Sequence, residues 1–298
     1  MIKKTKCTLC SETKFTKLYS GTIRDGKFGS YTEENFDIVK CKGCGLVRLF
    51  QNPYTLETYK SKEYRDSYND SHKPEDYLSS LDFEQPPRLK TIGMEACRNK
   101  IVLDNGCGAA SFLDLLKGSS KKTIGIEPFS GYHSSIKKRG HEIFQDSEKA
   151  LKKYENKVDL VTSFCVIEHT IDPLTYLKNS HSLLKNGGKM FIETDNNNDI
   201  LKKIIPQDFD SFFYRTAHLW YFDEKTLKKI ALKAGFKIEK IYFRQNFDIS
   251  NLLSWIKEKK PTGNGKIKIF NDNFNKFWKS YLEEKGIADL VCIELTKN

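Results

Sequence analysis

The chain has 298 residues, of which 38% are hydrophobic and 30% are charged, the balance of a water-soluble globular protein with one large domain or two smaller ones. No run of about 18 apolar residues occurs and the first residues lack the apolar core of a signal peptide, so a membrane-spanning protein is excluded and a cytoplasmic location is expected. The formal charge of +11 comes mostly from lysine, with only eight arginines among 50 cationic side chains, so we expect a solvated surface rather than a nucleic-acid partner.

Two C-x2-C pairs lie near the start of the chain. Cys7 and Cys10 form the first pair, and Cys41 and Cys44 follow after thirty residues. Four thiolates in this pattern bind Zn²⁺ tetrahedrally and leave no ligand position for water, so we expect a structural rather than a catalytic zinc. A disulfide framework is disfavoured because no secretion signal is found. We therefore predict a small zinc-ribbon-like module over residues 1–50.

Residues 51–100 are rich in tyrosine and polar side chains and end in the proline-containing stretch 85–88. One interpretation is a segment of one or two helices that forms a lid over the following domain. The alternative is a linker without regular structure. The composition of the segment fits both.

From residue 101 onward, short apolar runs alternate with stretches of helical periodicity. This alternation predicts a doubly wound α/β domain over residues 101–298, with a mostly parallel sheet and right-handed crossovers. In such a sheet, ligands bind at the carboxyl ends of the strands. The predicted strands are residues 101–104, 123–127, 142–144, 158–164 and 189–194. The predicted helices are residues 130–139, 147–154 and 173–185.

The turn after the first predicted strand has the composition of a ligand site. Asp104 ends the strand, and Gly106 and Gly108 permit positive φ angles and let a ligand lie directly against the main chain. Dinucleotide sites carry a third glycine, but Ser111 stands where it is expected, which disfavours NAD and FAD. Glu127 ends the second strand twenty-three residues after Asp104, close to the spacing of the acid that binds ribose hydroxyls in nucleotide sites.

Four stretches within residues 101–195 are similar to successive motifs of the class I S-adenosylmethionine-dependent methyltransferases. They are Asp-x-Gly-x-Gly at 104–108, Gly-Ile-Glu-Pro at 125–128, Ile-Glu-His-x-x-Asp-Pro at 167–173 and Asn-Gly-Gly at 186–188. The resemblance implies a Rossmann-like sheet of seven strands, in which residues 236–244 and 289–296 pair antiparallel at one edge. It also implies that S-adenosylmethionine is the cofactor.

The resemblance assigns roles to individual residues. In this family the two glycines face the methionine half of the cofactor, the first acid holds its amino end, and the second acid binds its ribose. Asp146, after the third strand, matches the acid that contacts the adenine amino group, and the same residue suits the N-cap of the following helix. The expected cofactor-binding residues are Asp104, Gly106, Gly108, Glu127, Asp146, Phe164 and Cys165.

Two histidines are candidates for the general base that removes a proton from the methyl acceptor. His169 follows the fourth strand beside Glu168, which can orient it or shape the cofactor pocket, and an imidazole has the near-neutral pKa that this role needs. An architectural role at the strand end is the alternative for this pair. His218 lies in the aromatic stretch 212–222, where the family places a substrate-facing loop, although aromatic clusters more often form core. The candidate catalytic residues are therefore His169, His218 and Glu168.

The acceptor is expected to be a small molecule. Paired C-x2-C motifs ahead of such a domain are similar to the nucleotide-sugar C-methyltransferases of deoxysugar pathways, which implies a sugar-like acceptor. This sequence departs from them by ending soon after the sheet, so methylation on carbon and methylation on oxygen both stay open. An RNA methyltransferase and a cofactor-binding protein without activity are the alternative functions. The insertion at 249–286 can supply a lid or a dimer contact, so an oligomer is possible.

Overall fold

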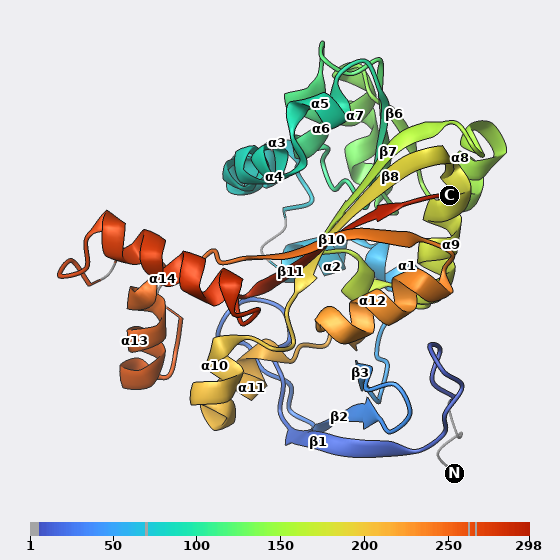
Figure 1. Ribbon diagram of the computed structural model, residues 1–298. Helices are drawn as coiled ribbons and strands as arrows, with labels where there is room; N and C mark the ends of the chain where they lie inside the picture. Colours follow the sequence, from blue (N-terminus) through green and yellow to red (C-terminus); the bar gives the residue numbers. More distant parts are fainter. Residues whose placement is uncertain (1–5, 69–70, 262, 266) are drawn as a thin grey trace. The chain divides into compact units, whose positions relative to one another are not determined.

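The computed structural model describes residues 6–68, 71–261, 263–265 and 267–298 (Figure 1). The chain divides into two compact units, each assembled from segments that are distant in sequence. The first unit is built from Met1–Asn52, Glu193–Lys229 and Lys240–Ile293. The second unit is built from Pro53–Ile192, Ile230–Glu239 and Glu294–Asn298. Segments from both halves of the sequence therefore meet within each unit.

A small antiparallel sheet lies in the first unit. Its strands, in the order of pairing, are β1 Phe15–Gly21, β2 Phe36–Cys41, β3 Val47–Leu49 and β9 Trp220–Tyr221. In β3 the side chains of Val47 and Leu49 are buried and that of Arg48 is half-buried, as the two-residue period of a strand requires. The cysteine-bearing part of the chain therefore shares a sheet with a strand from beyond residue 200.

Four helices of the first unit follow from local capping signals. They are α10 Ile200–Ile204, α11 Pro206–Phe213, α13 Ile249–Glu258 and α14 Asp272–Glu284. Asp199, Asp248 and Asn271 cap α10, α13 and α14 by accepting hydrogen bonds from backbone N–H groups of the first turn. The buried Trp255 of α13 packs edge-on against Phe209 of α11, with ring centroids 5.2 Å apart. The insertion at 249–286 thus contains two helices.

Residues 56–97 of the second unit form a run of short helices, which we call the helical segment. Its elements are α1 Leu56–Tyr59, α2 Lys62–Ser67, α3 Pro74–Leu81, the 3-10 turn η1 Asp82–Glu84, α4 Gln85–Ile92 and α5 Met94–Cys97. Thr55 and Ser61 cap the first two helices, and Pro74 occupies the first turn of α3, where its missing N–H costs nothing. The segment has more helices than the one or two expected, and its action as a lid stays a prediction.

Seven strands form the second sheet, in the order β10-β11-β8-β7-β4-β5-β6 (Figure 1). Their bounds are β4 Ile101–Asn105, β5 Lys122–Ile126, β6 Glu142–Phe144, β7 Val158–Phe164, β8 Leu184–Asp195, β10 Lys237–Arg244 and β11 Leu290–Thr296. β4 pairs in parallel with both β5 and β7, and β5 pairs in parallel with β6. The predicted Rossmann-like α/β class with a seven-stranded, mostly parallel sheet is confirmed. The strand order reverses at β4, so the carboxyl end of β4 is where a ligand is expected.

Helices that follow the strands supply the apolar layers of the second unit. They are α6 Ser111–Leu116, η2 Ser130–Tyr132, α7 His133–Lys138, α8 Ser147–Tyr154, η3 Ile167–His169 and α9 Pro173–Leu183. The helix α12 Glu224–Lys233 has residues in both units. Phe112 and Leu116 of α6 are buried with Val102 and Leu160 in one core cluster. Leu113, on another face of α6, is buried with Tyr132 and other residues in a second cluster. Because α6 contributes to both clusters, the turn that precedes it is firmly held.

The strand β8 is longer than the sequence predicts. The pattern predicts a strand over 189–194 after an Asn-Gly-Gly turn, whereas β8 begins at Leu184 and includes that turn. Gly187 has a φ of +73°, which glycine adopts without strain, and its N–H donates to the carbonyl of Lys297 at 2.8 Å. This end of the strand pairs with Lys297, a distant residue, so the local sequence does not predict the extension.

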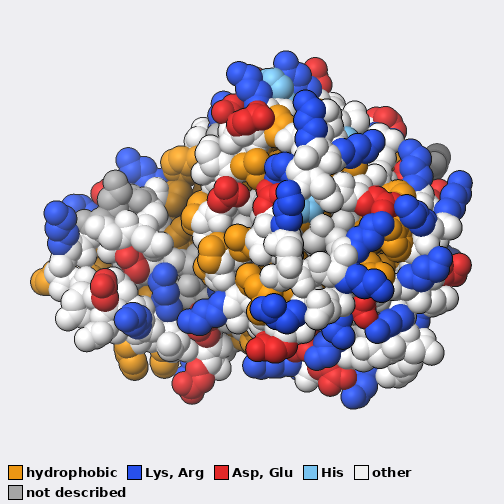
Figure 2. Space-filling model, turned by 90° about the horizontal axis from the view of Figure 1, so that it is seen from above, with side chains coloured by type: hydrophobic (Ala, Val, Ile, Leu, Met, Phe, Trp, Pro, Cys, Tyr) orange, Lys and Arg blue, Asp and Glu red, His pale blue; other side chains and the backbone are white. Residues whose placement is uncertain are grey.

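Lysine and arginine side chains are spread over the face seen in Figure 2, with acidic side chains between them. This distribution agrees with the interpretation of the excess charge as a solvated surface. Among the described residues, no helix is long and apolar enough to cross a membrane.

Candidate functional site

The turn between β4 and α6 has the backbone of a close-contact site. Gly106 and Gly108 have φ angles of +94° and +53°, as their glycine identity predicts. A Cβ added to Gly106 would overlap the side chain of Val166, and one added to Gly108 would overlap the hydroxyl of Tyr77. Val166 follows β7 and Tyr77 lies on α3. The glycines are therefore required both by the turn and by the groups packed against it.

Glu127, directly after β5, accepts three hydrogen bonds from within the second unit. Its Oε1 accepts hydrogen bonds from the backbone N–H of Phe129 at 2.8 Å and from Arg65 Nη2 at 2.5 Å. Its Oε2 accepts from the backbone N–H of Gly108 at 3.1 Å. The side chain is 2% exposed. The sheet thus brings Glu127 and the glycine turn together, as predicted, and Arg65 joins them from the helical segment.

Asp104, the last-but-one residue of β4, is buried. Burial raises the pKa of its carboxyl to about 6, although a hydrogen bond from the Thr162 hydroxyl and the charge of Arg88 both act to lower it. The Thr162 Oγ1 to Asp104 Oδ1 distance is 2.7 Å. The guanidinium of Arg88, on α4, lies 4.7 Å from the ring centroid of Phe164 at the end of β7. Asp104 and Phe164 therefore both have Arg88 as a neighbour.

The residues after β7 form a tight connection at the carboxyl edge of the sheet. Cys165 has a φ of +54°, an uncommon conformation for a residue with a side chain. Glu168 and His169 lie on η3, and Glu168 is 1% exposed. His169 Nδ1 lies 3.5 Å from the hydroxyl of Tyr64, which is on α2. His169 is thus oriented by a tyrosine of the helical segment.

Asp146 has one of its two predicted roles. Its side chain accepts a hydrogen bond from the backbone N–H of Lys149 at 2.8 Å and so caps α8. The carboxylate also lies 3.5 Å from the ammonium of Lys149, and 38% of the side chain is exposed. The adenine contact of this residue stays a prediction.

His218 belongs to the first unit, where its neighbours are charged. The residue is 3% exposed, and its Nδ1 lies 3.5 Å from Asp195 Oδ2, at the end of β8. The same oxygen of Asp195 accepts a hydrogen bond from Arg215 Nη2 at 2.7 Å. The ring of Tyr221 lies beside the imidazole. A buried imidazole next to a carboxylate has the partner that stabilises a histidine after it takes up a proton.

The four predicted zinc ligands, Cys7, Cys10, Cys41 and Cys44, converge in the first unit. Their sulfur atoms all lie within 4.8 Å of one another, and all four residues are free thiols. Burial raises the pKa of Cys41, but hydrogen bonds from the backbone of Cys44, the Cys10 thiol and the backbone of Gly43 bring it to about 7. Four sulfurs at this spacing form a donor set that suits tetrahedral Zn²⁺.

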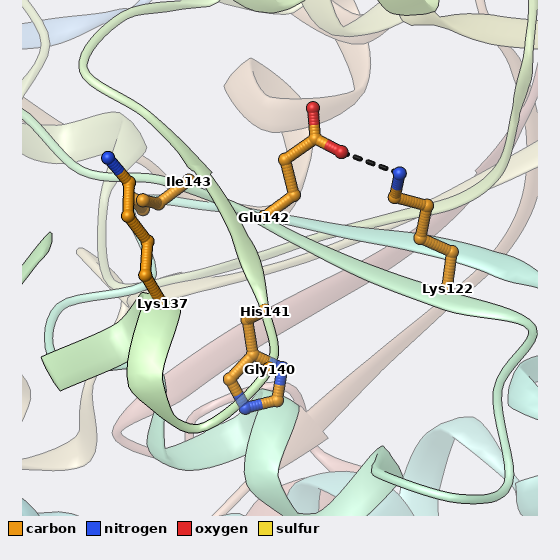
Figure 3. A pocket seen from close by; sticks show the side chains of 6 residues that line it. All are labelled: Lys122, Lys137, Gly140, His141, Glu142 and Ile143. Atoms are coloured by element: carbon orange, nitrogen blue, oxygen red, sulfur yellow. Dashed lines mark ion pairs between the residues drawn. The ribbon is translucent and has the colours of Figure 1, made fainter. Parts of the chain in front are cut away.

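A shallow pocket lies away from these residues, at the amino ends of β5 and β6 (Figure 3). Lys122, Lys137, His141 and Glu142 line it, and Lys122 Nζ forms an ion pair with Glu142 at 2.6 Å. In a doubly wound sheet, ligands bind at the opposite, carboxyl ends of the strands. This pocket is therefore not the candidate site.

Several site residues belong to no recognisable sequence motif. Arg65, Tyr77 and Arg88 lie on short helices 16 to 39 residues before Asp104. Asp195 stands 23 residues before His218, beyond the reach of any local pattern. The tyrosine-rich composition of residues 51–100 favoured helices there, but it did not single out these side chains.

Comparisons with known proteins point to methyltransferases. A family model described as a methyltransferase domain matches residues 83–241. The chain is 28% identical over 144 residues to the ubiquinone biosynthesis O-methyltransferase of Coxiella burnetii, covering 46% of this chain and 61% of that protein. It is 24% identical over 193 residues to the mitochondrial ubiquinone biosynthesis O-methyltransferase of Homo sapiens, covering 59% of this chain and 50% of that protein. The chain thus spans between half and 61% of the length of these two relatives.

One solved structure shows how far the fold extends. It is an N-methyltransferase of Haemonchus contortus in complex with phosphomonomethylethanolamine and S-adenosylhomocysteine. It matches 84% of this chain and 62% of that chain, with a TM-score of 0.52 and 14% sequence identity. At this identity the match is a likeness of fold alone.

Proposed function

The chain belongs to the methyltransferase-domain family, and we propose that it transfers a methyl group from S-adenosylmethionine to an oxygen of a small, sugar-like acceptor. The observation that carries the proposal is the pairing of the buried Glu127 with the turn at Gly106 and Gly108. A carboxylate can accept hydrogen bonds from the ribose hydroxyls, and glycines beside it let the cofactor approach the main chain closely. The names of the relatives, which are O-methyltransferases, support oxygen over carbon as the acceptor atom.

The charges of residues in the second unit support this cofactor. Glu127 would accept the ribose hydroxyls, and Asp104 would hold the amino group, whose positive charge favours the ionised form of a carboxyl with a pKa near 6. Phe164 and Cys165 would line the pocket, and Asp146 would contact the adenine. When bound, the sulfonium of the cofactor supplies an electrophilic methyl group. The protein needs only to position the acceptor and receive its proton.

We assign the proton-accepting role to one of two histidines. His169 has the hydroxyl of Tyr64 at 3.5 Å, and His218 has the carboxylate of Asp195 at 3.5 Å. A carboxylate stabilises an imidazolium more than a tyrosine hydroxyl does, which favours His218, whereas His169 belongs to the same unit as the cofactor-binding residues, so both histidines stay candidates for the base. Glu168, buried next to His169 in the sequence, would orient that imidazole or shape the cofactor pocket.

We propose that the cysteine cluster holds a structural Zn²⁺. Four sulfurs fill a tetrahedral shell, so the ion would have no position for water or acceptor. The chemistry at the carboxyl edge of the sheet therefore does not need this metal. Its contribution would be to fix the two cysteine turns against each other, as structural zinc does in small modules with little core.

The experiment that tests the function is a titration followed by an acceptor screen. Calorimetry of the purified protein with S-adenosylhomocysteine is expected to give a one-to-one complex. A methyl-transfer assay is then run with nucleotide sugars, free sugars and phenols, and with a structured RNA as a control acceptor. Methylation of a sugar hydroxyl supports the proposal. Absence of S-adenosylhomocysteine binding, or transfer to RNA alone, would overturn it.

A further inference from the structure

We propose that Arg65 competes with the ribose of the cofactor for the carboxylate of Glu127, and so weakens the binding of both cofactor and product. The inference rests on the proposed function, because it takes Glu127 as the ribose anchor. Arg65 lies on α2 in the helical segment, and Glu127 follows β5, so the contact joins the segment to the sheet within the second unit.

Donors from the protein occupy most of the hydrogen-bond acceptor positions of the Glu127 carboxylate. Among the described residues it has three N–H donors: Phe129 N and Arg65 Nη2 on Oε1, and Gly108 N on Oε2. A carboxylate offers about four lone-pair positions, two on each oxygen. One position therefore remains, and it is on Oε2. A ribose that donates one hydroxyl to each oxygen also needs a position on Oε1.

Of the two donors to Oε1, Arg65 is the one that can leave. The N–H of Phe129 belongs to the backbone two residues after Glu127 and cannot withdraw without moving the chain after β5. The guanidinium sits at the end of a long side chain with several rotatable bonds. Arg65 also covers the acid, because the two side chains are 11% and 2% exposed. Entry of a diol therefore breaks the Arg65 contact.

The arginine is held in place by more than its ion pair. Its guanidinium carbon lies 5.7 Å, 5.9 Å and 5.5 Å from the ring centroids of Tyr64, Phe129 and Tyr132. Planar cations pack favourably on such rings. Because these rings belong to the site itself, the guanidinium stays close after displacement and returns when the ligand leaves. The Arg65 guanidinium therefore competes with the bound ligand for Glu127, which favours release of the product.

The competition makes an unusual prediction for ligands that lack one hydroxyl. A deoxyadenosine that keeps only the hydroxyl facing Oε2 uses the remaining position and leaves Arg65 in place. A deoxyadenosine that keeps only the hydroxyl facing Oε1 must displace Arg65 for a single hydrogen bond. The wild type is therefore expected to bind 2′-deoxyadenosine and 3′-deoxyadenosine with affinities that differ by about ten- to hundredfold, the value of one hydrogen bond to a charged group.

The test is calorimetry at pH 8 on the wild type, Arg65→Ala and Arg65→Lys, with S-adenosylhomocysteine and the two deoxyadenosines as probes. Arg65→Ala is expected to bind S-adenosylhomocysteine roughly three- to tenfold more tightly and to bind the two deoxyadenosines within about threefold of each other. Arg65→Lys, which keeps the charge on one nitrogen, is expected to lie between. Arg98→Ala, which removes an exposed arginine just after α5, is the matched control and should behave as wild type.

The outcomes separate this inference from the function it rests on. Weaker binding of S-adenosylhomocysteine to Arg65→Ala would mean that Arg65 holds the ligand and would overturn the competition. An unequal pair of deoxyadenosines in the variant would do the same. If Arg65→Ala fails to fold, as judged by circular dichroism, Arg65→Lys decides by the same criteria. A wild type that binds none of the probes would refute the proposed function, and the competition with it.

Discussion

Replacing Glu127 by glutamine tests the ribose anchor with little change of shape. A carboxamide has one oxygen and one NH₂ group, so one of the two backbone donors, Phe129 N or Gly108 N, then faces another donor. The loss of one charged hydrogen bond to the ligand, and the weakening of the other, is expected to cost about 1.5–3 kcal/mol of binding free energy. The dissociation constant for S-adenosylhomocysteine should rise about ten- to hundredfold in calorimetry.

The same substitution should also lower the melting temperature. A buried backbone N–H without an acceptor costs about 1–3 kcal/mol, which for a chain of this size corresponds to roughly 2–4 °C per kcal/mol in a thermal scan. The matched control is Glu142→Gln, which removes a carboxylate from the other end of the sheet, where Glu142 pairs with Lys122 and Lys153 at 2.6 Å. The control should leave ligand affinity unchanged. A Glu127→Gln protein that is folded and binds within threefold of wild type would refute the role of this carboxylate.

Three further predictions concern other parts of the molecule. Because burial raises the pKa of Asp104 to about 6, the free energy of unfolding falls as pH rises between about 4 and 6. The Asp104→Asn variant should therefore have a higher melting temperature than wild type at pH 8, lose that advantage at pH 4, and bind S-adenosylhomocysteine less tightly. Equal melting temperatures at pH 8 would contradict this. Metal analysis should find one Zn²⁺ per chain in wild type and none in Cys41→Ser, which should melt at lower temperature; a wild type without zinc would rule out the metal site. Replacing the base should slow methyl transfer and alter its pH profile without changing cofactor affinity. This behaviour in both His218→Gln and Asp195→Asn would identify His218, and the same behaviour in His169→Gln alone would identify His169.

The glycine turn and the acids of the site could be predicted because each belongs to a short pattern. Gly106 and Gly108 follow Asp104 within four residues, and Glu127 stands at the end of the next strand, where strand periodicity places it. The four cysteines were found in the same way, from the spacing within each pair. In these cases each residue belongs to a recognisable short pattern, even though the contact itself spans 19 residues between Gly108 and Glu127 and 37 between Cys7 and Cys44. The fold class followed from the same regular alternation.

The partners of these residues could not be predicted, because long-range packing alone selects them. Arg65 reaches Glu127 across 62 residues of sequence, and Tyr64 reaches His169 across 105. The helices that carry them are short, and α2 has only six residues, which is too few for a periodic pattern to reveal a buried face. The extension of β8 to Leu184 has the same cause, since its pairing partner includes Lys297.

The pairing of β3 with β9 has a consequence for how the protein is made. Val47 opposes Tyr221 and Arg48 opposes Trp220. The outer edge of β3, in the hairpin of β2 and β3, therefore stays unpaired until residue 221 has left the ribosome. Translation at about 5–20 residues per second places that moment roughly 10 to 35 seconds after the hairpin itself emerges. A metal ion bound by the four cysteines would hold the nascent hairpin in register during that interval. Growth medium depleted of zinc should then lower the yield of correctly folded chain during synthesis, before any loss of stability in the finished protein becomes visible.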